Sequence, residues 1–588
     1  MLAGEQTYNE IQELSHARRA MMGGGQHADV IAVIAIVVAW IAMIAIINPV
    51  GDFPLNDDWI YGGSAELLAR TGEFRIPGYP IANVLSQAAW GAGFCLLFGT
   101  SYTVLRFSTL ILGLVGLLAL YALIRNIGGD RRTALLGSAT LAVNPLYVQL
   151  AHSYMTDVPF ASLSIVAIAL FARGFWLQSR LSLLAGVIVS LTVLLDRQFA
   201  IVLLLGLAVA YPFRFGRNAG SVIRGVIPLG LGLALHYAYQ RWLIDTGRGP
   251  GVVHLGITDV APRSVPMFLL RFMSLSANAA PYFGLFALPW MIDLSARSTR
   301  ARGARWETAV RVACALLAFG LCYNLWRSGA VPALENVLMP WGLGPLTLRD
   351  TYILHQHLPP TTTVVVAIWI ILSALGAFGD YLLLCTVIFA LADWWKGRQD
   401  WEPGRRALAV YMAVVMAAYW TIICLIADVT GFFDRYLLFM LPMILIFVTV
   451  LARPQGGDAI AVRGSPGAIW AVPIVALGIF AAFSAAETHD YLAWNRTRWT
   501  AINDLIHVAN VAPEKIDGGY EYNGRYFYDP SYLEKPGTSW WWIVDDEYAV
   551  AFGDLENYRR IREYPIKRWL PLSEPAIVVS RRLTPGGG

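Results

Sequence analysis

The chain has 588 residues, of which 57% are hydrophobic and only 14% are charged, and its net charge is +4. Soluble globular proteins carry about a quarter charged residues, so this composition excludes an ordinary soluble protein and indicates a polytopic membrane protein. The small net charge does not suggest a nucleic-acid-binding protein. The five cysteines form no Cys-x-x-Cys pair, so we expect neither a disulfide framework nor a cysteine metal site.

The first long apolar run, residues 30–50, follows a polar N-terminal tail at residues 1–29. About 20 apolar residues suffice to cross a bilayer. The run ends without the small-x-small pattern that marks a cleaved signal peptide. We therefore expect a cytoplasmic tail followed by a retained membrane helix.

Two adjacent acids, Asp57 and Asp58, lie shortly after this run, in the sequence Asn-Asp-Asp-Trp. Carboxylates beside a bilayer are costly and usually functional, and a helix cap needs only one acid. The pair is therefore the strongest candidate for a functional site. The amphipathic residues 59–70 that follow are expected to lie in the membrane interface, with Trp59 and Ile60 facing lipid.

A second apolar run, residues 81–98, is long enough to span. A span here would invert the alternation of cation-rich and cation-poor loops farther along the chain. We therefore expect an interfacial or re-entrant segment within a long first outer loop, residues 51–101.

Twelve further apolar segments predict about thirteen membrane helices in all. Arginine and lysine gather in alternate loops, as expected of the cytoplasmic side. This alternation places the region from about residue 485 onward outside. The further candidate spans are residues 102–124, 133–150, 158–173, 181–195, 199–213, 221–239, 266–290, 308–326, 361–392, 407–427, 432–452 and 466–484.

The later outer loops carry further charged residues at the ends of apolar segments. Asp157 begins one segment, where it could also be a simple helix cap. Asp196 and Arg197 form a tight turn between two others, where they could be a local ion pair. The remaining candidates are His254, Glu335, Arg349, Asp350, His355, His357, Asp434, Arg435 and Tyr436.

The C-terminal region, residues 485–588, differs in composition from the rest. Residues 487–588 hold 27 charged and 17 aromatic side chains among 102 residues. Short runs at 526–528 and 576–579 are typical of strands, and Gly518–Gly519 of a turn. We expect a small mixed α/β domain. Its Trp540–Trp542 run could be an exposed surface that stacks on sugar rings, or part of a core or membrane-docking face.

These residues together resemble the GT-C glycosyltransferases, most of all the branch of the protein O-mannosyltransferases and lipid A aminoarabinose transferases. The likeness is clearest over residues 30–215. One departure is the proline-led segment before the second apolar run, which is reduced to Gly78-Tyr79-Pro80. The matching features are Asp57-Asp58, Leu97-Phe98-Gly99-Thr100-Ser101, Leu105-Arg106-Phe107, Asn144-Pro145, the Asp157 loop and Asp434-Arg435-Tyr436-Leu437-Leu438.

The resemblance implies a GT-C fold over residues 30–484 and transfer of a sugar from a polyprenyl phosphate. It implies that Asp57 or Asp58 is the general base and that Asp157 assists. By the same likeness, arginines at the outer face stabilise the leaving phosphate; the candidates are Arg435, Arg197 and Arg349. Candidate residues for the acceptor or sugar are Trp59, Tyr61, Trp541 and Tyr436.

The resemblance leaves one cofactor open, a divalent metal, with Asp57, Asp157 and His254 as candidates for part of its site. His355 and His357 lack a third ligand at a telling spacing.

The sequence therefore predicts a polytopic α-helical membrane protein with a C-terminal extracytoplasmic α/β domain, in a bacterial inner membrane. The resemblance implies transfer of a hexose or pentose, with inversion, to a hydroxyl of a lipid, polysaccharide or protein. A whole-glycan oligosaccharyltransferase or ligase remains an alternative. A secondary transporter is a second alternative, although it predicts charges at mid-membrane and broken helices, rather than charges at helix ends.

Overall fold

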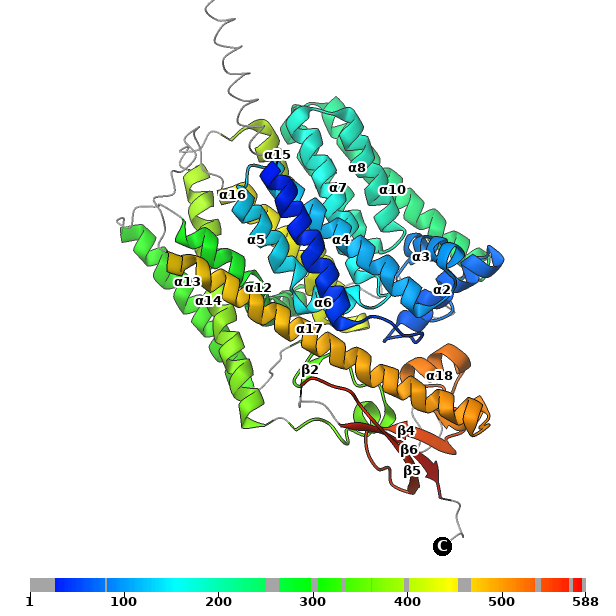
Figure 1. The fold of residues 1–588 in the computed structure, drawn as a ribbon. Helices are drawn as coiled ribbons and strands as arrows, with labels where there is room; N and C mark the ends of the chain where they lie inside the picture. The colour runs from blue at the N-terminus through cyan, green and yellow to red at the C-terminus, as the bar shows by residue number, and fades with distance from the viewer. Residues whose placement is uncertain are drawn as a thin grey trace, which may run out of the picture.

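The structure is a computed structural model that describes residues 27–79, 82–249, 264–297, 305–328, 334–360, 362–395, 401–452, 467–534, 541–570 and 575–583. Long helices form a bundle, and a small sheet with helix α18 lies at one end of that bundle (Figure 1). This end also carries the loops that contain Asp57 and Arg349, so it is the end that positions the candidate site.

The first helix runs from His27 to Ile47. It ends where Asn48 takes a positive φ of 57° and Pro49 follows. The later helices of the bundle are α2 (Asp58–Thr71), α3 (Leu85–Phe98), α4 (Tyr102–Asn126), α5 (Arg131–Ala142), α6 (Pro145–Ala151), α7 (Asp157–Leu177), α8 (Arg180–Leu194), α9 (Ile201–Phe215), α10 (Ala219–Asp245), α12 (Val265–Ala296), α13 (Arg305–Ser328), α14 (Thr363–Trp395), α15 (Pro403–Thr430), α16 (Leu437–Ala452) and α17 (Gly467–Asn503).

Among the described residues, ten helices are long and apolar enough to cross a membrane, or eleven if the bent pair α5–α6 is one span. The predicted class, a polytopic helical membrane protein with a small C-terminal mixed domain, is confirmed. The expected count of about thirteen is corrected to ten or eleven. Helix α8 shows why: its 15 residues rise about 22 Å, which is less than a hydrocarbon core of about 30 Å.

Helices α2 and α3 form a hairpin-like pair after the first helix. The expectation that Trp59 and Ile60 face lipid is wrong, because they are only 3% and 0% exposed. Trp59 instead packs against aromatic rings of the C-terminal domain, with Trp542 at 5.6 Å between ring centroids. Helix α3 has 14 residues and is too short to span, as expected for an interfacial or re-entrant segment.

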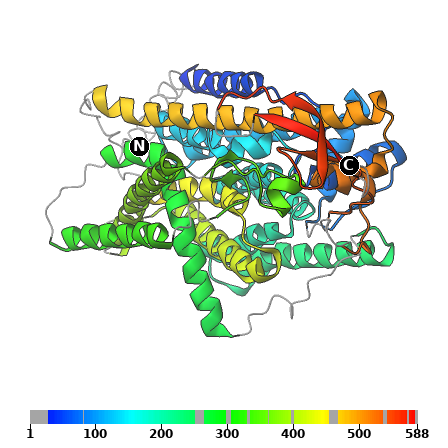
Figure 2. The ribbon, with the colours of Figure 1, turned by 90° about the horizontal axis from the view of Figure 1, so that it is seen from below.

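The C-terminal sheet has the strand order β3-β4-β6-β5, with β3 parallel to β4 and the other pairs antiparallel. Helix α17 runs without a break through residue 485 into this region, and the sheet lies beside its C-terminal half (Figure 2). The strands are β3 (Ile516–Asp517), β4 (Tyr548–Ala551), β5 (Tyr558–Pro565) and β6 (Ala576–Arg582).

Two local predictions in this domain have different outcomes. The strand expected at 576–579 is confirmed as part of β6. The strand expected at 526–528 is wrong, because Tyr526 and Phe527 end α18 (Tyr520–Phe527). A short aromatic run does not by itself distinguish a strand from a helix turn.

A buried ion pair joins α17 to α18. Arg498 Nη1 lies 2.7 Å from Glu521 Oε2, and both side chains are fully buried. Glu521 also accepts hydrogen bonds from the Asn56 backbone N–H at 2.9 Å and from the Thr347 hydroxyl. One carboxylate thus ties the C-terminal domain to the segment before Asp57.

Replacing Arg498 with methionine is expected to lower the free energy of unfolding by about 3–5 kcal/mol, because Glu521 would remain buried without its cation. Thermal unfolding of the purified protein measures this. The control is Arg560→Met, which removes exposed ion pairs to Asp554 and Glu563 and should change stability much less. Equal effects of the two substitutions would contradict the assignment of Arg498.

Candidate active site

Asp57 stands at the start of α2 and faces two partners from distant parts of the chain. Its Oδ1 accepts a hydrogen bond of 2.7 Å from the Tyr520 hydroxyl, and its Oδ2 lies 3.4 Å from Arg435 Nη1. The side chains of Asp57 and Arg435 keep 17% and 11% exposure. The carboxylate is therefore neutralised but not sealed from solvent.

A second ion pair joins Asp157 and Arg197, 3.1 Å apart and nearly fully buried. The Arg197 Nε also donates to the Thr156 hydroxyl at 2.6 Å. Asp157 is therefore not a simple helix cap: the N-cap of α7 is Thr156, and no side-chain hydrogen bond caps this helix. Arg197 therefore pairs with Asp157 from a separate loop, and the alternative of a local ion pair between Asp196 and Arg197 is wrong.

Tyr61 on α2 joins the two ion pairs into one cluster. The pKa of the buried Tyr61 hydroxyl is raised, first by burial, and the charges of Asp57, Asp157, Arg197 and Arg435 all act on it. Arg435 in turn interacts electrostatically with both carboxylates. Four separate segments of the bundle thus place two acids, two arginines and a tyrosine near one another.

Asp58 points away from this cluster and is fully buried. Its two oxygens accept hydrogen bonds from the backbone N–H groups of Leu55 and Tyr154. Burial raises the pKa of Asp58 to about 7, although the charge of Arg106 opposes the shift. Asp58 is therefore placed to hold the loop rather than to meet a substrate.

Arg106 completes the support of that loop from α4. Its guanidinium donates to the carbonyl oxygens of Pro49, Gly51 and Phe53, and its Cζ lies 4.5 Å from the Phe53 ring centroid. The backbone before Asp57 is therefore fixed from the membrane side by an arginine that belongs to the Leu-Arg-Phe sequence noted above.

Asp196 lies next to the cluster, and both its oxygens lack a hydrogen-bond donor among the described residues. Burial raises the pKa of Asp196 to about 8, while Arg197 lowers it and Asp157 raises it further. Folding favours the neutral form of the Asp196 side chain. Its contribution to the free energy of unfolding is therefore fully present below about pH 4 and is lost as the pH rises through about 8.

An Asp196→Asn substitution should therefore make stability less dependent on pH. The melting temperature of the wild type is expected to fall more steeply between about pH 5 and pH 8 than that of the variant. Some slope will remain, because Asp58 titrates near the same range. Parallel curves for the two proteins would show that Asp196 is already ionised in the fold.

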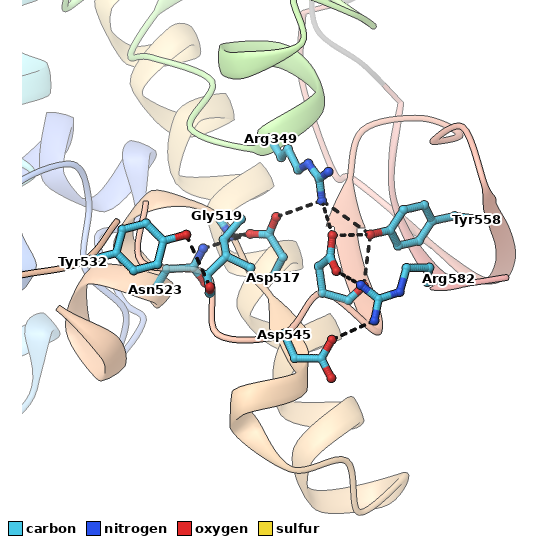
Figure 3. Close-up of polar contacts among 10 residues, drawn as sticks. Arg349, Asp517, Gly519, Asn523, Tyr532, Asp545, Tyr558 and Arg582 are labelled. Carbon is cyan, nitrogen blue, oxygen red and sulfur yellow. Dashed lines mark hydrogen bonds and ion pairs between the residues drawn. The ribbon is translucent and has the colours of Figure 1, made fainter. Parts of the chain in front are cut away.

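Arg349 belongs to a different network, inside the C-terminal domain (Figure 3). Its Nη1 lies 2.7 Å from Asp546 Oδ2 and 3.9 Å from Asp517 Oδ2, and the Tyr558 hydroxyl joins the same group. This arginine is thus engaged in joining the loop before α14 to the sheet, in contrast to Arg435 and Arg197.

Two tryptophans of the predicted Trp540–Trp542 run are buried, whereas Trp569, farther along the domain, is exposed. Trp541 and Trp542 are 1% and 5% exposed, so the expectation of an exposed sugar-stacking surface is wrong for both. Trp541 packs against Tyr352 and Tyr520, with ring centroids 5.0 and 5.6 Å away. Of the alternatives, a core position therefore holds for both, although this core is shared with the helix bundle; Trp540 lies outside the described residues.

The remaining predicted sugar-contact residues are buried around the cluster. Trp59, Tyr61 and Tyr436 are 3%, 3% and 7% exposed, and the Tyr436 ring centroid lies 5.9 Å from Arg435 Cζ. Tyr520 contacts Asp57 but was not predicted, since nothing in the sequence links residues 463 positions apart. Its hydroxyl lies 2.5 Å from the hydroxyl of Tyr79.

Metal ligands do not gather in the described part of the chain: no group of three or more His, Cys, Asp or Glu side chains there could hold an ion. Asp57 and Asp157 each pair with an arginine, which is unlike a metal site. His254 lies outside the described residues. His357 pairs with Asp350 at 3.1 Å.

Comparison with known families finds that residues 88–237 match the model described as dolichyl-phosphate-mannose-protein mannosyltransferase. This segment contains Asp157 and Arg197. Comparison with the curated proteins finds no match.

Solved structures with some similarity include the S. cerevisiae protein O-mannosyltransferase Pmt1-Pmt2 complex bound to the sugar donor. It is 18% identical, with 36% of this chain and 33% of that chain covered and a TM-score of 0.29. ArnT from Cupriavidus metallidurans bound to undecaprenyl phosphate is 14% identical, with 94% and 97% covered and a TM-score of 0.38. Its apo state is also 14% identical, with 95% and 98% covered and a TM-score of 0.39.

TM-scores of this size support no inference about the site. The family match stands on sequence alone and covers the segment that holds one of the two ion pairs. Residues 88–237 match the model of this mannosyltransferase family, which bears out the predicted resemblance to the polyprenyl-phosphate-sugar glycosyltransferases.

Proposed function

We propose that the protein transfers a monosaccharide from a polyprenyl phosphate to an acceptor hydroxyl, by direct displacement at the anomeric carbon. The observation that carries this proposal is the cluster of Asp57, Arg435, Asp157 and Arg197 at one end of the helix bundle. The family match over residues 88–237 supports the donor class.

Asp57 is the better of the two candidate bases. It is partly exposed and opposite a cation, whereas Asp58 is sealed among backbone N–H groups. In the proposed step, Asp57 takes the proton of the acceptor hydroxyl while that oxygen forms its bond to the anomeric carbon. The bond from that carbon to the phosphate oxygen breaks, and the configuration inverts.

Arg435 is the first candidate for binding the leaving phosphate, and Arg197 the second. A guanidinium offers a planar fork that matches two phosphate oxygens, and fixed cations near developing negative charge lower the barrier. Asp157 holds Arg197 in place.

The site is proposed to face the outer side of a bacterial inner membrane, with residues 485–588 extracytoplasmic. The alternation of cationic loops in the sequence supports this orientation. The acceptor is proposed to be a lipid, polysaccharide or protein hydroxyl near that face, with Tyr61 and Tyr436 beside the sugar.

The product of the reaction tests this chemistry. Mass spectrometry of the glycosylated acceptor should show the addition of one sugar, and NMR should show an anomeric configuration opposite to that of the donor. Addition of a whole glycan would indicate an oligosaccharyltransferase or ligase instead. Retained configuration would contradict the direct displacement by an acceptor activated at Asp57.

A further inference from the structure

The first two residues of α18 hold the two residues that lead into α2. The Tyr520 hydroxyl donates to Asp57 at 2.7 Å, and Glu521 accepts from the backbone N–H of Asn56 at 2.9 Å. Two neighbouring contacts of this kind fix both the backbone and the side chain at Asp57. The C-terminal domain therefore meets the candidate base directly.

The hydroxyl of Tyr520 has one proton to donate, and its short contacts indicate which group accepts it. Asp57 accepts it, so the Tyr79 hydroxyl, 2.5 Å away, is left to donate to the Tyr520 oxygen. A chain of donors thus runs from Tyr79 through Tyr520 to the carboxylate. Tyr520 itself is only 5% exposed.

The start of α18 is held firmly enough to aim this hydroxyl. The Tyr520 N–H donates to the Thr347 carbonyl at 3.1 Å. Gly519 has a φ of +86°, and a Cβ there would lie 2.5 Å from that same carbonyl oxygen. A side chain at position 519 would therefore push α18 away from the bundle.

The network around Arg349 extends this support (Figure 3). Asp517 accepts from the Gly519 N–H at 3.2 Å and from the Asn523 amide at 2.9 Å, and Arg349 lies on its other side. Arg349, a candidate for binding the phosphate, instead contacts Asp517. Asp517 in turn accepts a hydrogen bond from Gly519, the residue before Tyr520. The place of Arg349 in the fold is that of a support for α18.

We propose that the C-terminal domain completes the active site, with Tyr520 as a positioning residue that fixes the rotamer of Asp57 for the acceptor hydroxyl. This inference rests on the proposed role of Asp57 as the base. It gives the domain a part in the transfer step itself, in addition to any binding of an acceptor.

A Tyr520→Phe substitution tests this, because it keeps the ring and removes only the hydroxyl. The kcat for transfer should fall about 10–100-fold, the range expected for one hydrogen bond to a charged group. The donor KM should stay within about twofold, because the hydroxyl contacts the base and not the phosphate-binding arginines. A merely structural role would lower the melting temperature and the folded fraction instead.

Tyr528→Phe is the matched control. Its ring packs in the same aromatic group, 5.6 Å from Trp59 and 5.0 Å from Trp542, and its hydroxyl has no hydrogen-bond partner among the described residues. This variant should keep the wild-type kcat. An equal loss in both variants would show a general packing effect and overturn the role of Tyr520.

Combining Tyr520→Phe with Asp57→Asn separates the two proposals. If Tyr520 acts through Asp57, the double variant should be no slower than Asp57→Asn alone. Additive losses, or full kcat in Tyr520→Phe beside an inactive Asp57→Asn, would overturn this inference and leave the base assignment intact. Full activity of Asp57→Asn would instead overturn the base assignment and, with it, the positioning role.

Discussion

Replacing Asp57 with asparagine is expected to slow sugar transfer by about 10²–10⁴-fold, the range typical of a lost general base. The amide keeps the size of the side chain and can still accept the hydrogen bond from Tyr520. Its NH₂ group would face Arg435, but this side chain is partly exposed, so the fold should survive. The measurement is single-turnover transfer from a polyprenyl-phosphate monosaccharide, which separates the chemical step from product release.

Asp58→Asn is the paired variant, and its effect should be of a different kind. Each oxygen of Asp58 accepts from a backbone N–H, so an amide NH₂ group would meet a donor and destabilise the loop. We expect a lower melting temperature with a chemical step slowed much less than in Asp57→Asn. The reverse order of the two rates would transfer the role of base to Asp58.

The second large effect is expected at Arg435. An Arg435→Gln substitution should lower kcat/KM for the donor by about 10²–10³-fold, as for removal of one preorganised group that stabilises transition-state charge. It would remove the cation that acts on both Asp57 and Asp157, although Asp157 keeps its pair with Arg197. Arg435→Lys should recover only part of the loss, because an ammonium lacks the planar fork.

Arg349→Gln is the control for this prediction. Arg349 pairs with Asp546 at 2.7 Å in the C-terminal domain, so its loss should lower stability and leave donor KM nearly unchanged. A larger rise in donor KM for Arg349→Gln than for Arg435→Gln would contradict the assignment of the phosphate site.

Much of the cluster could be predicted because charged residues at the ends of apolar segments are few. Asp57, Asp157, Arg197 and Arg435 each end or begin such a segment, and alternate loops of a membrane protein meet on one side. Sidedness therefore predicts that these four lie near one another. Which acid pairs with which arginine depends on helix packing. Arg197 pairs with Asp157 and not with its sequence neighbour Asp196.

Other features depend on contacts that no local pattern contains. Asp57 and Asp58 are adjacent acids that differ in where their side chains point. The direction of Asp58 is set by the backbone N–H groups of Leu55 and Tyr154, which donate to its carboxylate. Trp541 is buried because the domain docks on the bundle, and Tyr520 reaches Asp57 by the same docking. Composition alone does not distinguish aromatic side chains on an exposed surface from aromatic side chains in a core.

The most direct test is transfer of radiolabelled sugar from a panel of polyprenyl-phosphate monosaccharides by the purified protein, with membrane extract as the source of acceptor and with Asp57→Asn beside the wild type. We predict transfer from at least one donor by the wild type and its loss in Asp57→Asn. Equal transfer by both proteins would contradict the role of Asp57. If the wild type neither binds nor turns over any of the donors, the proposed glycosyltransferase activity is contradicted.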